Sequence, residues 1–343
     1  MQAMLLERLG RIDSTSAPLS PATLPDPVPG PGALLVEVAV CGVCHTELDE
    51  IEGRTPPPRL PVVPGHQIVG RVSALGVGVR GFAVGERVGV AWIHSACGAC
   101  RFCRAGGENL CPEFVATGRD VDGGYAELTT VPAEFAHRIP DALADAAAAP
   151  LLCAGAIGWR SLRLAGLADG ERLGLTGFGG SGHLVLELAR HLYPKSSVYV
   201  FARSPSEREF ARELGAVWAG DTREASPEKL DAILDTTPAW TPVVEALANL
   251  APGGRLVINA IRKEDADRGR LADLDYARHL WLEKEIKSVA NVTRRDVREL
   301  LELVAAGARI VAEVQEFGLG EANAALLELK RGGVRGSKVL RVR

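Results

Sequence analysis

Four cysteines stand at the spacing that metal sites use. Cys97, Cys100 and Cys103 follow one another with two-residue gaps, and Cys111 comes eight residues later. Two-residue gaps let successive thiolates turn toward one point, and four thiolates around Zn²⁺ make a closed tetrahedral site. An iron–sulfur cluster is the main alternative, because it also uses Cys-x₂-Cys-x₂-Cys. Four protein ligands leave no open position for a substrate, so this spacing favours a structural zinc.

Three further residues with metal-ligand chemistry are spread along the chain. Cys44 follows a strand-like run, His66 stands in Pro-Gly-His-Gln, and Cys153 lies where the composition of the chain changes. Two thiolates and one imidazole would leave a fourth position open, as a catalytic zinc requires. Spacing alone supports this weakly, since a lone buried cysteine is usually a small core residue. Cys41 has no assigned role.

A glycine-rich loop predicts a dinucleotide site. It reads Gly-Phe-Gly-Gly-Ser-Gly, stands between a short apolar run and a helical pattern, and contains Gly177, Gly179, Gly180 and Gly182. Glycines in this order allow a tight turn and let a pyrophosphate approach the helix N-terminus. A turn without a ligand is the alternative reading.

The end of the next strand predicts which dinucleotide binds. NAD sites place Asp or Glu there for the ribose hydroxyls, but this strand ends in Ala202, followed by Arg203 and Ser204. A guanidinium can pair with a 2′-phosphate, and the serine hydroxyl can donate to it. We therefore expect NADP(H) to be favoured over NAD(H), with a solvated surface arginine as the alternative.

The elements that must position these residues fall into two groups. The first half is rich in Gly and Pro and contains short β-like runs at 34–40, 68–74, 87–90 and 127–131. Beyond residue 172 strands and helices alternate, which predicts a parallel sheet covered on both faces. The last part of the chain predicts a capped helix from Thr293, a helix over 321–330 and a strand over 338–342.

Length, charge and cysteine count limit the function classes. The chain has 343 residues, which suggests two domains, and its formal net charge of −4 argues against nucleic-acid and anionic-membrane surfaces. We recognise no secretory signal and no apolar run long enough to span a bilayer. The seven cysteines are an odd number and a poor disulfide framework. We therefore expect a cytoplasmic protein with no nucleic-acid or membrane partner.

Taken in order, these motifs resemble the zinc-dependent medium-chain alcohol dehydrogenases along essentially the whole chain. The matching pieces are Cys-Gly-Val-Cys-His-Thr (41–46), Val-Pro-Gly-His (63–66), the cysteine quartet, Pro-Leu-Leu-Cys-Ala-Gly (150–155) and the glycine loop. The resemblance implies an α/β protein with a β-rich GroES-like catalytic domain (1–152 and 290–343) that holds two zinc ions. A doubly wound parallel-sheet Rossmann domain would cover 153–289. The implied reaction is reversible hydride transfer between a small alcohol, oxidised to an aldehyde or ketone, and a nicotinamide cofactor, in a homodimer or homotetramer.

The resemblance also implies roles for single residues. Cys44, His66 and Cys153 would hold the catalytic zinc, and Thr46 would accept the alcohol proton. We infer that Asp49 or His45 passes this proton on. The remaining implied contacts are a pocket for an apolar substrate, lined by Ile51, Trp92 and Ile93, and a cofactor contact by Lys338. For Trp92, an ordinary core position is the alternative.

Two residues near the metal depart from the family pattern. Gln67 stands where the family usually has Glu, and Glu47 replaces a shorter Asp. Each change removes or moves a carboxylate, which puts metal affinity, ligand exchange and pH dependence in doubt.

Three other functions compete with this interpretation. A zinc-independent quinone or enoyl reductase on the same scaffold would generally lack both cysteine sets. A zinc hydrolase would not need the glycine loop. A non-enzymatic zinc-binding interaction module is disfavoured, because the chain has no basic stripe for nucleic acid.

Overall fold

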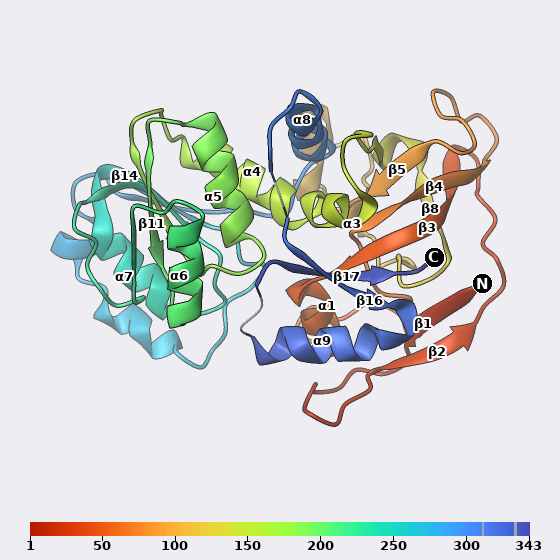
Figure 1. Ribbon diagram of the computed structural model, residues 1–343, viewed down its shortest axis with the longest axis horizontal. Coiled ribbons are helices and arrows are strands. Elements are labelled where there is room, and N and C mark those ends of the chain that lie inside the picture. The colour runs from red at the N-terminus through yellow and green to blue at the C-terminus, as the bar shows by residue number, and fades with distance from the viewer. Residues whose placement is uncertain (311, 333–334) are drawn as a thin grey trace. The chain divides into compact units, whose positions relative to one another are not determined.

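Strand order distinguishes two compact units in the computed structural model, which describes residues 1–310, 312–332 and 335–343 (Figure 1). Unit 1 comprises Met1–Ala156, Val292–Gly307 and Ala312–Arg343. Unit 2 comprises Ile157–Asn291 and Ala308–Val311. The expected fold class is confirmed, because one unit is β-rich and mixed in strand direction while the other is built on a parallel sheet.

Unit 2 is built on a six-stranded parallel sheet with the order β12-β11-β10-β13-β14-β15. Numbered along the chain, this is the order 3-2-1-4-5-6 of the doubly wound dinucleotide-binding fold. The inner strands β11 and β13 are mostly buried and apolar, as expected of a sheet covered by helices, whereas the edge strand β15 is exposed. Their bounds are β10 Arg172–Thr176, β11 Ser197–Phe201, β12 Trp218–Gly220, β13 Leu230–Asp235, β14 Leu250–Ile258 and β15 Glu285–Ser288.

Helices connect the strands of unit 2 and pack against its sheet. Helix α6 (Pro205–Glu213) contacts β11 and β12, and α7 (Thr241–Asn249) contacts β10, β13 and β14 (Figure 1). Apolar side chains from α7 and the strands form the core of this unit. The other helical elements are α4 Ala154–Ala165, α5 Gly182–Leu192, η4 Arg268–Asp273 and η5 Tyr276–Leu280.

Unit 1 is built around the long strand β3 (Ala33–Val43), which pairs with three other strands. The seven-stranded sheet has the order β16-β17-β3-β4-β5-β9, with β8 also paired to β3. Its other strands are β4 Ile68–Leu75, β5 Arg87–Val90, β8 Leu128–Pro132, β9 Ala136–Arg138, β16 Val314–Gly318 and β17 Ser337–Arg341. Two smaller sheets pair β1 (Gln2–Leu6) with β2 (Leu19–Thr23) and β6 (Ile93–Ser95) with β7 (Val115–Ala116).

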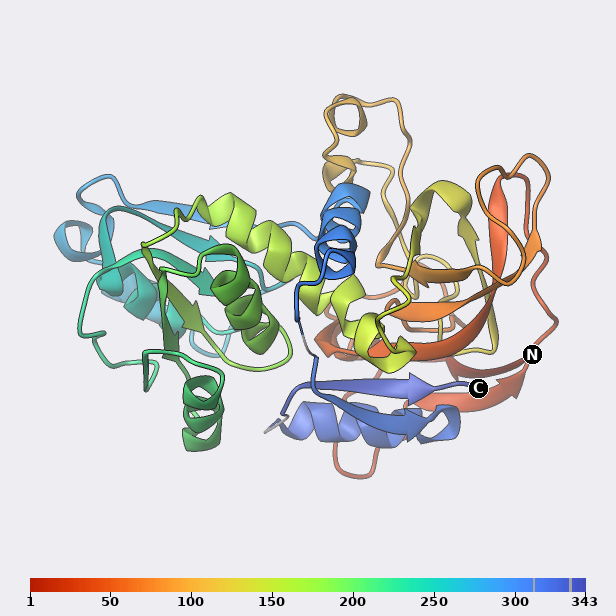
Figure 2. The same cartoon turned by 45° about the horizontal axis from the view of Figure 1, so that its top comes forward.

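The helices of unit 1 are short, apart from α8 and α9. Helix α8 (Arg294–Ala305) begins at Thr293, whose hydroxyl and backbone form a capping box with Asp296, as its sequence predicts. The tan segment that carries the cysteine quartet projects beside α8 (Figure 2). The other helical elements are α1 His45–Ile51, α2 Arg101–Arg104, η1 Glu108–Leu110, η2 Ala133–Phe135, α3 Asp145–Ala148, η3 Ala149–Leu152, η6 Leu319–Glu321 and α9 Ala322–Arg331.

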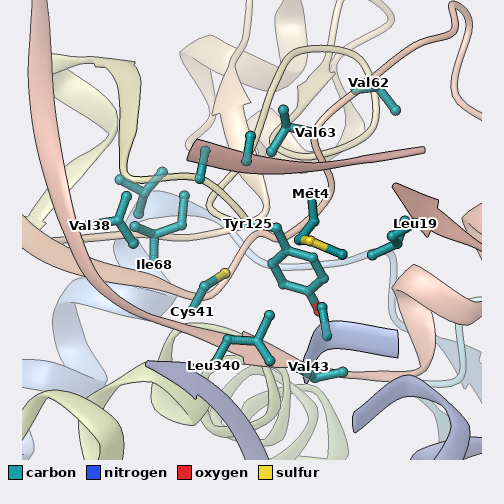
Figure 3. Close-up of a cluster of buried hydrophobic side chains, with 14 of the residues drawn as sticks. Met4, Leu19, Val38, Cys41, Val43, Val62, Val63, Ile68, Tyr125 and Leu340 are labelled. Carbon is teal, nitrogen blue, oxygen red and sulfur yellow. The ribbon is translucent and has the colours of Figure 1, made fainter. Parts of the chain in front are cut away.

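The core of unit 1 explains the seventh cysteine. Cys41 is fully buried and lies among apolar side chains that include Val38, Ile68 and Tyr125 (Figure 3). Its sulfur packs so closely on Gly65 that a Cβ there would lie 2.8 Å from it. Cys41 is therefore a packing residue. Within the described part of the chain, no helix combines the length and apolar character needed to cross a membrane.

Candidate metal and cofactor sites

Helix α1 starts directly after Cys44, so one residue both caps the helix and offers a metal-binding thiol. The Cys44 Sγ accepts a hydrogen bond from the backbone N–H of Thr46 at 3.4 Å. In return, the backbone N–H of Cys44 donates to Oε2 of Glu47 at 2.8 Å. This reciprocal capping box fixes the thiol at the point where β3 ends and α1 begins.

The structure brings Cys44, His66 and Cys153 together. One ligand atom from each lies within 4.8 Å of the other two. The Cys44 Sγ and His66 Nε2 are 3.7 Å apart, and two such ligands of one tetrahedral zinc would be about 3.6 Å apart. His66 precedes β4, and Cys153 follows η3. Two sulfurs and one imidazole nitrogen at this spacing fit a zinc ion with one open position.

Glu47 lies behind His66 and determines how the imidazole is held. Its Oε1 is 2.6 Å from His66 Nδ1, and both side chains are buried. With Nδ1 facing Glu47, the other ring nitrogen of His66, Nε2, faces the Cys44 sulfur. Burial alone would lower the His66 pKa, but the charges of Glu47 and Cys44 outweigh it and raise the pKa well above its ordinary value. A carboxylate behind a histidine is the usual support of a zinc-binding imidazole.

The surroundings of the Cys44 thiol also favour a bound cation. A hydrogen bond with Cys153, burial and the Glu47 carboxylate raise the pKa of the Cys44 thiol well above its ordinary value. A divalent cation between the ligands would reverse this effect, because it stabilises the thiolate. The donor set therefore suits a metal better than it suits free thiols.

Gln67 and Asp49 both lie near this centre but are engaged by other parts of unit 1. The Gln67 side chain packs over Gly42, where a Cβ would lie 2.6 Å from its Oε1. The Asp49 Oδ1 accepts from Arg54 Nε at 2.7 Å, and Arg54 Nη2 lies 2.6 Å from the same oxygen. The buried Asp49 carboxylate is thus paired with the more exposed Arg54.

The structure changes the expectation for four residues. Ile51 and Ile93 are fully buried in the hydrophobic core of unit 1, so they do not line an open pocket. Trp92 is partly exposed, and its ring centroid lies 5.0 Å from that of Phe114. Lys338 is buried and donates from Nζ to Gln315 Oε1 at 2.6 Å and Glu328 Oε2 at 2.7 Å. These contacts join β17 to β16 and α9, which does not support a cofactor contact.

The cysteine quartet forms a second cluster. All four sulfurs lie within 4.8 Å of one another. Cys97 Sγ is 3.5 Å from Cys111 Sγ and 3.9 Å from Cys103 Sγ, against about 3.8 Å for two thiolates on one tetrahedral zinc. Backbone N–H groups also donate to these sulfurs, from Cys100 to Cys97 at 3.3 Å and from Glu113 to Cys111 at 3.3 Å.

The thiol pKa values show why this cluster needs a cation. A backbone N–H hydrogen bond from Cys103 is the largest of the effects that lower the pKa of Cys100 to about 7. Desolvation and the neighbouring thiols raise the pKa of Cys103 to about 12. A zinc ion among the four sulfurs would supply the positive charge that stabilises clustered thiolates.

The loop that holds the quartet is tied to α8 by a carboxylate that the sequence analysis missed. Glu108, in η1, is buried, and its Oε1 accepts from the backbone N–H of Arg294 at 2.9 Å and from its Nε at 3.2 Å. Arg294 Nη1 also donates to Glu134 at 2.7 Å. The sequence did contain a signal for Glu108, because it is an acidic residue inside the Gly-rich stretch between the third and fourth cysteines.

The glycine loop connects β10 to α5 and leaves space for a ligand. Gly177 has φ of +79°, and a Cβ there would lie 2.8 Å from Thr236 Oγ1. A Cβ on Gly182 would lie 2.8 Å from the Gly177 carbonyl oxygen, whereas one on Gly179 would meet no atom within 4 Å. Gly180 lies in the same turn. Open space above Gly179, next to the N-terminus of α5, fits a dinucleotide pyrophosphate.

Two arginines lie where β11 ends, and one of them, Arg208, is paired with Asp221 at 3.4 Å. Arg203 is exposed and makes no ion pair within the described part of the chain. Ser204 is the N-cap of α6, and its Oγ lies 2.6 Å from Ser206 Oγ. Arg208 Nη1 donates to the carbonyl oxygens of Ala202 at 2.9 Å and Arg203 at 3.1 Å. Two hydroxyls and an uncommitted guanidinium suit a phosphate better than a ribose hydroxyl.

Comparison with known proteins shows what the whole chain is similar to. Residues 30–141 match the alcohol dehydrogenase GroES-like domain. The chain is 44% identical over 345 residues to "Probable alcohol dehydrogenase AdhA" of Mycobacterium tuberculosis (strain CDC 1551 / Oshkosh), covering 99% of this chain and 97% of that protein. It is 33% identical to an alcohol dehydrogenase of Geobacillus stearothermophilus, covering 91% and 92%. The structure of the cinnamyl alcohol dehydrogenase SbCAD4 from Sorghum bicolor matches with a TM-score of 0.86 at 27% identity, covering 99% and 97%.

Proposed function

Because the chain belongs to the zinc-dependent medium-chain alcohol dehydrogenase family, we propose that it transfers hydride reversibly between a small alcohol and NADP. The observation that carries this proposal is the Cys44–His66–Cys153 cluster, whose ligand atoms lie within 4.8 Å of one another. We assign a catalytic zinc to this cluster and a structural zinc to Cys97, Cys100, Cys103 and Cys111. The product of the oxidation is an aldehyde or a ketone.

In this proposal the residues of α1 prepare the site and move the proton. When bound, the catalytic zinc supplies Lewis-acid polarisation of the substrate oxygen. Glu47 holds His66 in one orientation through the 2.6 Å contact to Nδ1. The Thr46 hydroxyl, in the first turn of α1, accepts the proton that the alcohol loses. His45, which is exposed, is the better route to solvent, because Asp49 is committed to Arg54.

The proposed preference for NADP(H) rests on the end of β11. Ala202 leaves no carboxylate for the ribose hydroxyls, and the exposed Arg203 guanidinium can pair with a 2′-phosphate. Ser204 adds a hydroxyl donor beside it. The glycines of the loop before α5 receive the pyrophosphate. In steady-state assays, kcat/KM for NADP is expected to exceed that for NAD, and equal efficiency would contradict this part of the proposal.

We also propose a homodimer or homotetramer. Strand β15 is the last strand in the order of the unit 2 sheet, and its four residues are exposed. Large exposed apolar side chains lie around this edge, namely Tyr276, Trp281, Leu282 and Ile286. An exposed edge with such side chains favours association with a second copy. Light scattering after gel filtration tests this, and a monomer would contradict it. For location we propose the cytoplasm, because both cysteine clusters need reduced thiols.

One experiment tests the central proposal. The purified chain is expected to contain about two zinc per chain and to reduce NADP only when an alcohol is present. Removing the metal with a chelator is expected to abolish turnover. Metal-independent turnover would favour a zinc-independent reductase, and bound zinc without turnover of any alcohol or carbonyl compound would favour a zinc-binding interaction module.

A further inference from the structure

The start of α5, next to the glycine loop, lacks the side-chain cap that a serine usually provides. Ser181 is the N-cap of α5, yet among the described residues its hydroxyl makes no capping hydrogen bond. The first N–H groups of the helix are therefore not occupied by this side chain and can face an anion. The shape of the loop before the helix then depends on other contacts.

His183, the second residue of α5, makes one of these contacts. Its Nδ1 lies 3.1 Å from the carbonyl oxygen of Gly179, and its backbone N–H donates to the same oxygen at 3.4 Å. A carbonyl oxygen can only accept a hydrogen bond, so Nδ1 carries the hydrogen and donates it. The imidazole thus holds one peptide of the glycine loop from the helix that follows the loop.

Aromatic packing holds the imidazole in place. His183 is 1% exposed, and its ring centroid lies 6.1 Å from that of Phe210 on α6. Phe178, the second residue of the glycine loop, packs edge-on against the same Phe210 ring, with 5.6 Å between the centroids. Phe210 therefore contacts both the loop and the histidine. Because a closely packed ring has little room to rotate, the imidazole keeps Nδ1 directed at Gly179.

The hydrogen bond from His183 also sets the direction of the next backbone N–H group. In a trans peptide, the C=O of one residue and the N–H of the following residue point in opposite directions. The Gly179 carbonyl is turned toward the buried imidazole, so the N–H of Gly180 is turned away from it. A Cβ on Gly179 would meet no atom within 4 Å. Open space at Gly179 and an outward N–H on Gly180 together suit an anionic group.

We propose that His183 is a positioning residue for the dinucleotide, because its Nδ1–H fixes the Gly179–Gly180 peptide so that the Gly180 N–H meets the pyrophosphate. This role rests on the proposed function, since it needs a dinucleotide in the glycine loop. A backbone donor that is already aligned loses little freedom when the ligand binds, so it adds more affinity than one that must first turn. The histidine itself is buried behind the loop and takes no part in hydride transfer.

Replacing His183 with the two amide residues isolates the contribution of Nδ1. The side-chain amide of Asn lies close to the position of the imidazole Nδ1, whereas the longer Gln carries its amide near the position of Nε2. His183→Asn can therefore keep the hydrogen bond to Gly179, and His183→Gln loses it. Both variants lose the ring that packs on Phe210, so a purely structural role would affect them alike.

The affinity of the zinc-loaded protein for NADP is the main measurement. In His183→Gln the dissociation constant is expected to rise roughly three- to tenfold, the equivalent of one weakened hydrogen bond, and in His183→Asn by about twofold or less. KM for NADP should rise with it while kcat stays nearly unchanged, because the pyrophosphate is held equally in the ground and transition states. His191, exposed on the same helix, provides the matched control: His191→Ala should change neither constant.

A second ligand locates the effect at the pyrophosphate. Adenosine 2′-phosphate lacks this group, so its dissociation constant should stay the same in every variant, and equal losses for both ligands would contradict the proposed role. If His183→Gln does not fold, His183→Leu removes the donor and keeps an apolar side chain. Wild-type affinity for NADP in the variant without the donor, or equal losses in the Gln and Asn variants, would overturn the role and leave packing on Phe210 as the function of His183. A wild-type protein that binds neither NADP nor NAD would instead count against the proposed function.

Discussion

The two carboxylate oxygens of Glu47 bind two different parts of unit 1. Oε1 lies 2.6 Å from Nδ1 of His66, while Oε2 accepts from the backbone N–H of Cys44 at 2.8 Å. One side chain therefore fixes both the start of α1 and the orientation of the imidazole. The longer Glu, in place of the family's Asp, still reaches the histidine. It does so from a position where it also caps the helix.

Replacing Glu47 with Gln tests this double contact. The amide oxygen can still accept from Cys44, so α1 is expected to remain intact, but the negative charge behind His66 is lost. We expect the affinity of the Cys44–His66–Cys153 centre for zinc to fall roughly 10- to 100-fold, as for other carboxylates that support a zinc-bound histidine. Competition with a chelating dye measures this. Unchanged affinity would show that the contact does not matter for the metal.

The cysteine quartet is expected to contribute to stability rather than to chemistry. Cys100→Ser removes a thiol whose pKa is about 7 and which accepts the N–H of Cys103 at 3.5 Å. The zinc content should fall from about two to about one per chain. The temperature of unfolding should fall by about 2–4 °C for each kcal/mol lost. Elemental analysis and calorimetry check both values, and a variant that keeps two zinc ions would contradict the assignment.

Much of the fold could be predicted because the signals were local. The strand over 87–90 has the predicted bounds, since it is set by its own apolar pattern and flanking turns. Strand β3 extends past the predicted end at residue 40 to Val43, because its last residues pair with β17, far along the chain. Strand β2 was not predicted; its alternation is weak and it contains Pro21.

The candidate sites, like the fold, could be predicted only in part, because contacts between distant segments leave no local signal in the sequence. The family resemblance, more than spacing alone, pointed to Cys44, His66 and Cys153, whose side chains the structure brings together. Spacing could not find the phase of α1, which depends on the cap at Cys44. That phase buries Ile51 in the core, where the sequence analysis had placed it at a substrate pocket. Lys338 was assigned to the cofactor because its buried partners, Gln315 and Glu328, are not visible from its own position in the sequence.

Two substitutions are expected to reverse the proposed preference for NADP. Arg203→Ala removes the guanidinium that would pair with the 2′-phosphate, so kcat/KM for NADP should fall about tenfold or more, the equivalent of one charge-assisted hydrogen bond. Turnover with NAD is the internal control and should change little. Adding Ala202→Asp supplies a carboxylate for the ribose hydroxyls and should make NAD the better cofactor. Equal losses with both cofactors would indicate a general defect.

Glu52 links the end of α1 to α9 and should make stability depend on acid. Burial would raise its pKa, but Lys330, the Ile12 N–H and Arg54 together lower it from 4.5 to about 2. A carboxyl group with a lowered folded-state pKa stabilises the protein above its unfolded value and loses this contribution as the pH falls toward 2. With allowance for screening at the exposed Lys330, we expect about 1–2 kcal/mol at neutral pH.

Chemical unfolding of wild type and Glu52→Gln at several pH values measures this contribution. At neutral pH the variant should be less stable by that amount, and the gap should close between pH 4.5 and 2, where the wild-type carboxyl group takes up its proton. Acid also releases zinc from thiolates, so only the difference between the two proteins at each pH is informative. A gap that stays constant with pH would mean that the ion pairs do not stabilise the fold.

Transfer of the alcohol proton to the Thr46 hydroxyl is the step of the proposed mechanism that a single substitution tests. Thr46 lies in the first turn of α1, and its backbone N–H donates to Cys44 Sγ at 3.4 Å, a contact that Val keeps because it is made by the main chain. Thr46→Val therefore removes the hydroxyl with little change in shape, and kcat should fall roughly 10²- to 10⁴-fold. Thr46→Ser restores a hydroxyl at the same position and should recover most of the activity. If the Val variant turns over alcohol at the wild-type rate, the proton leaves by another group, and His45→Ala is then the variant to compare.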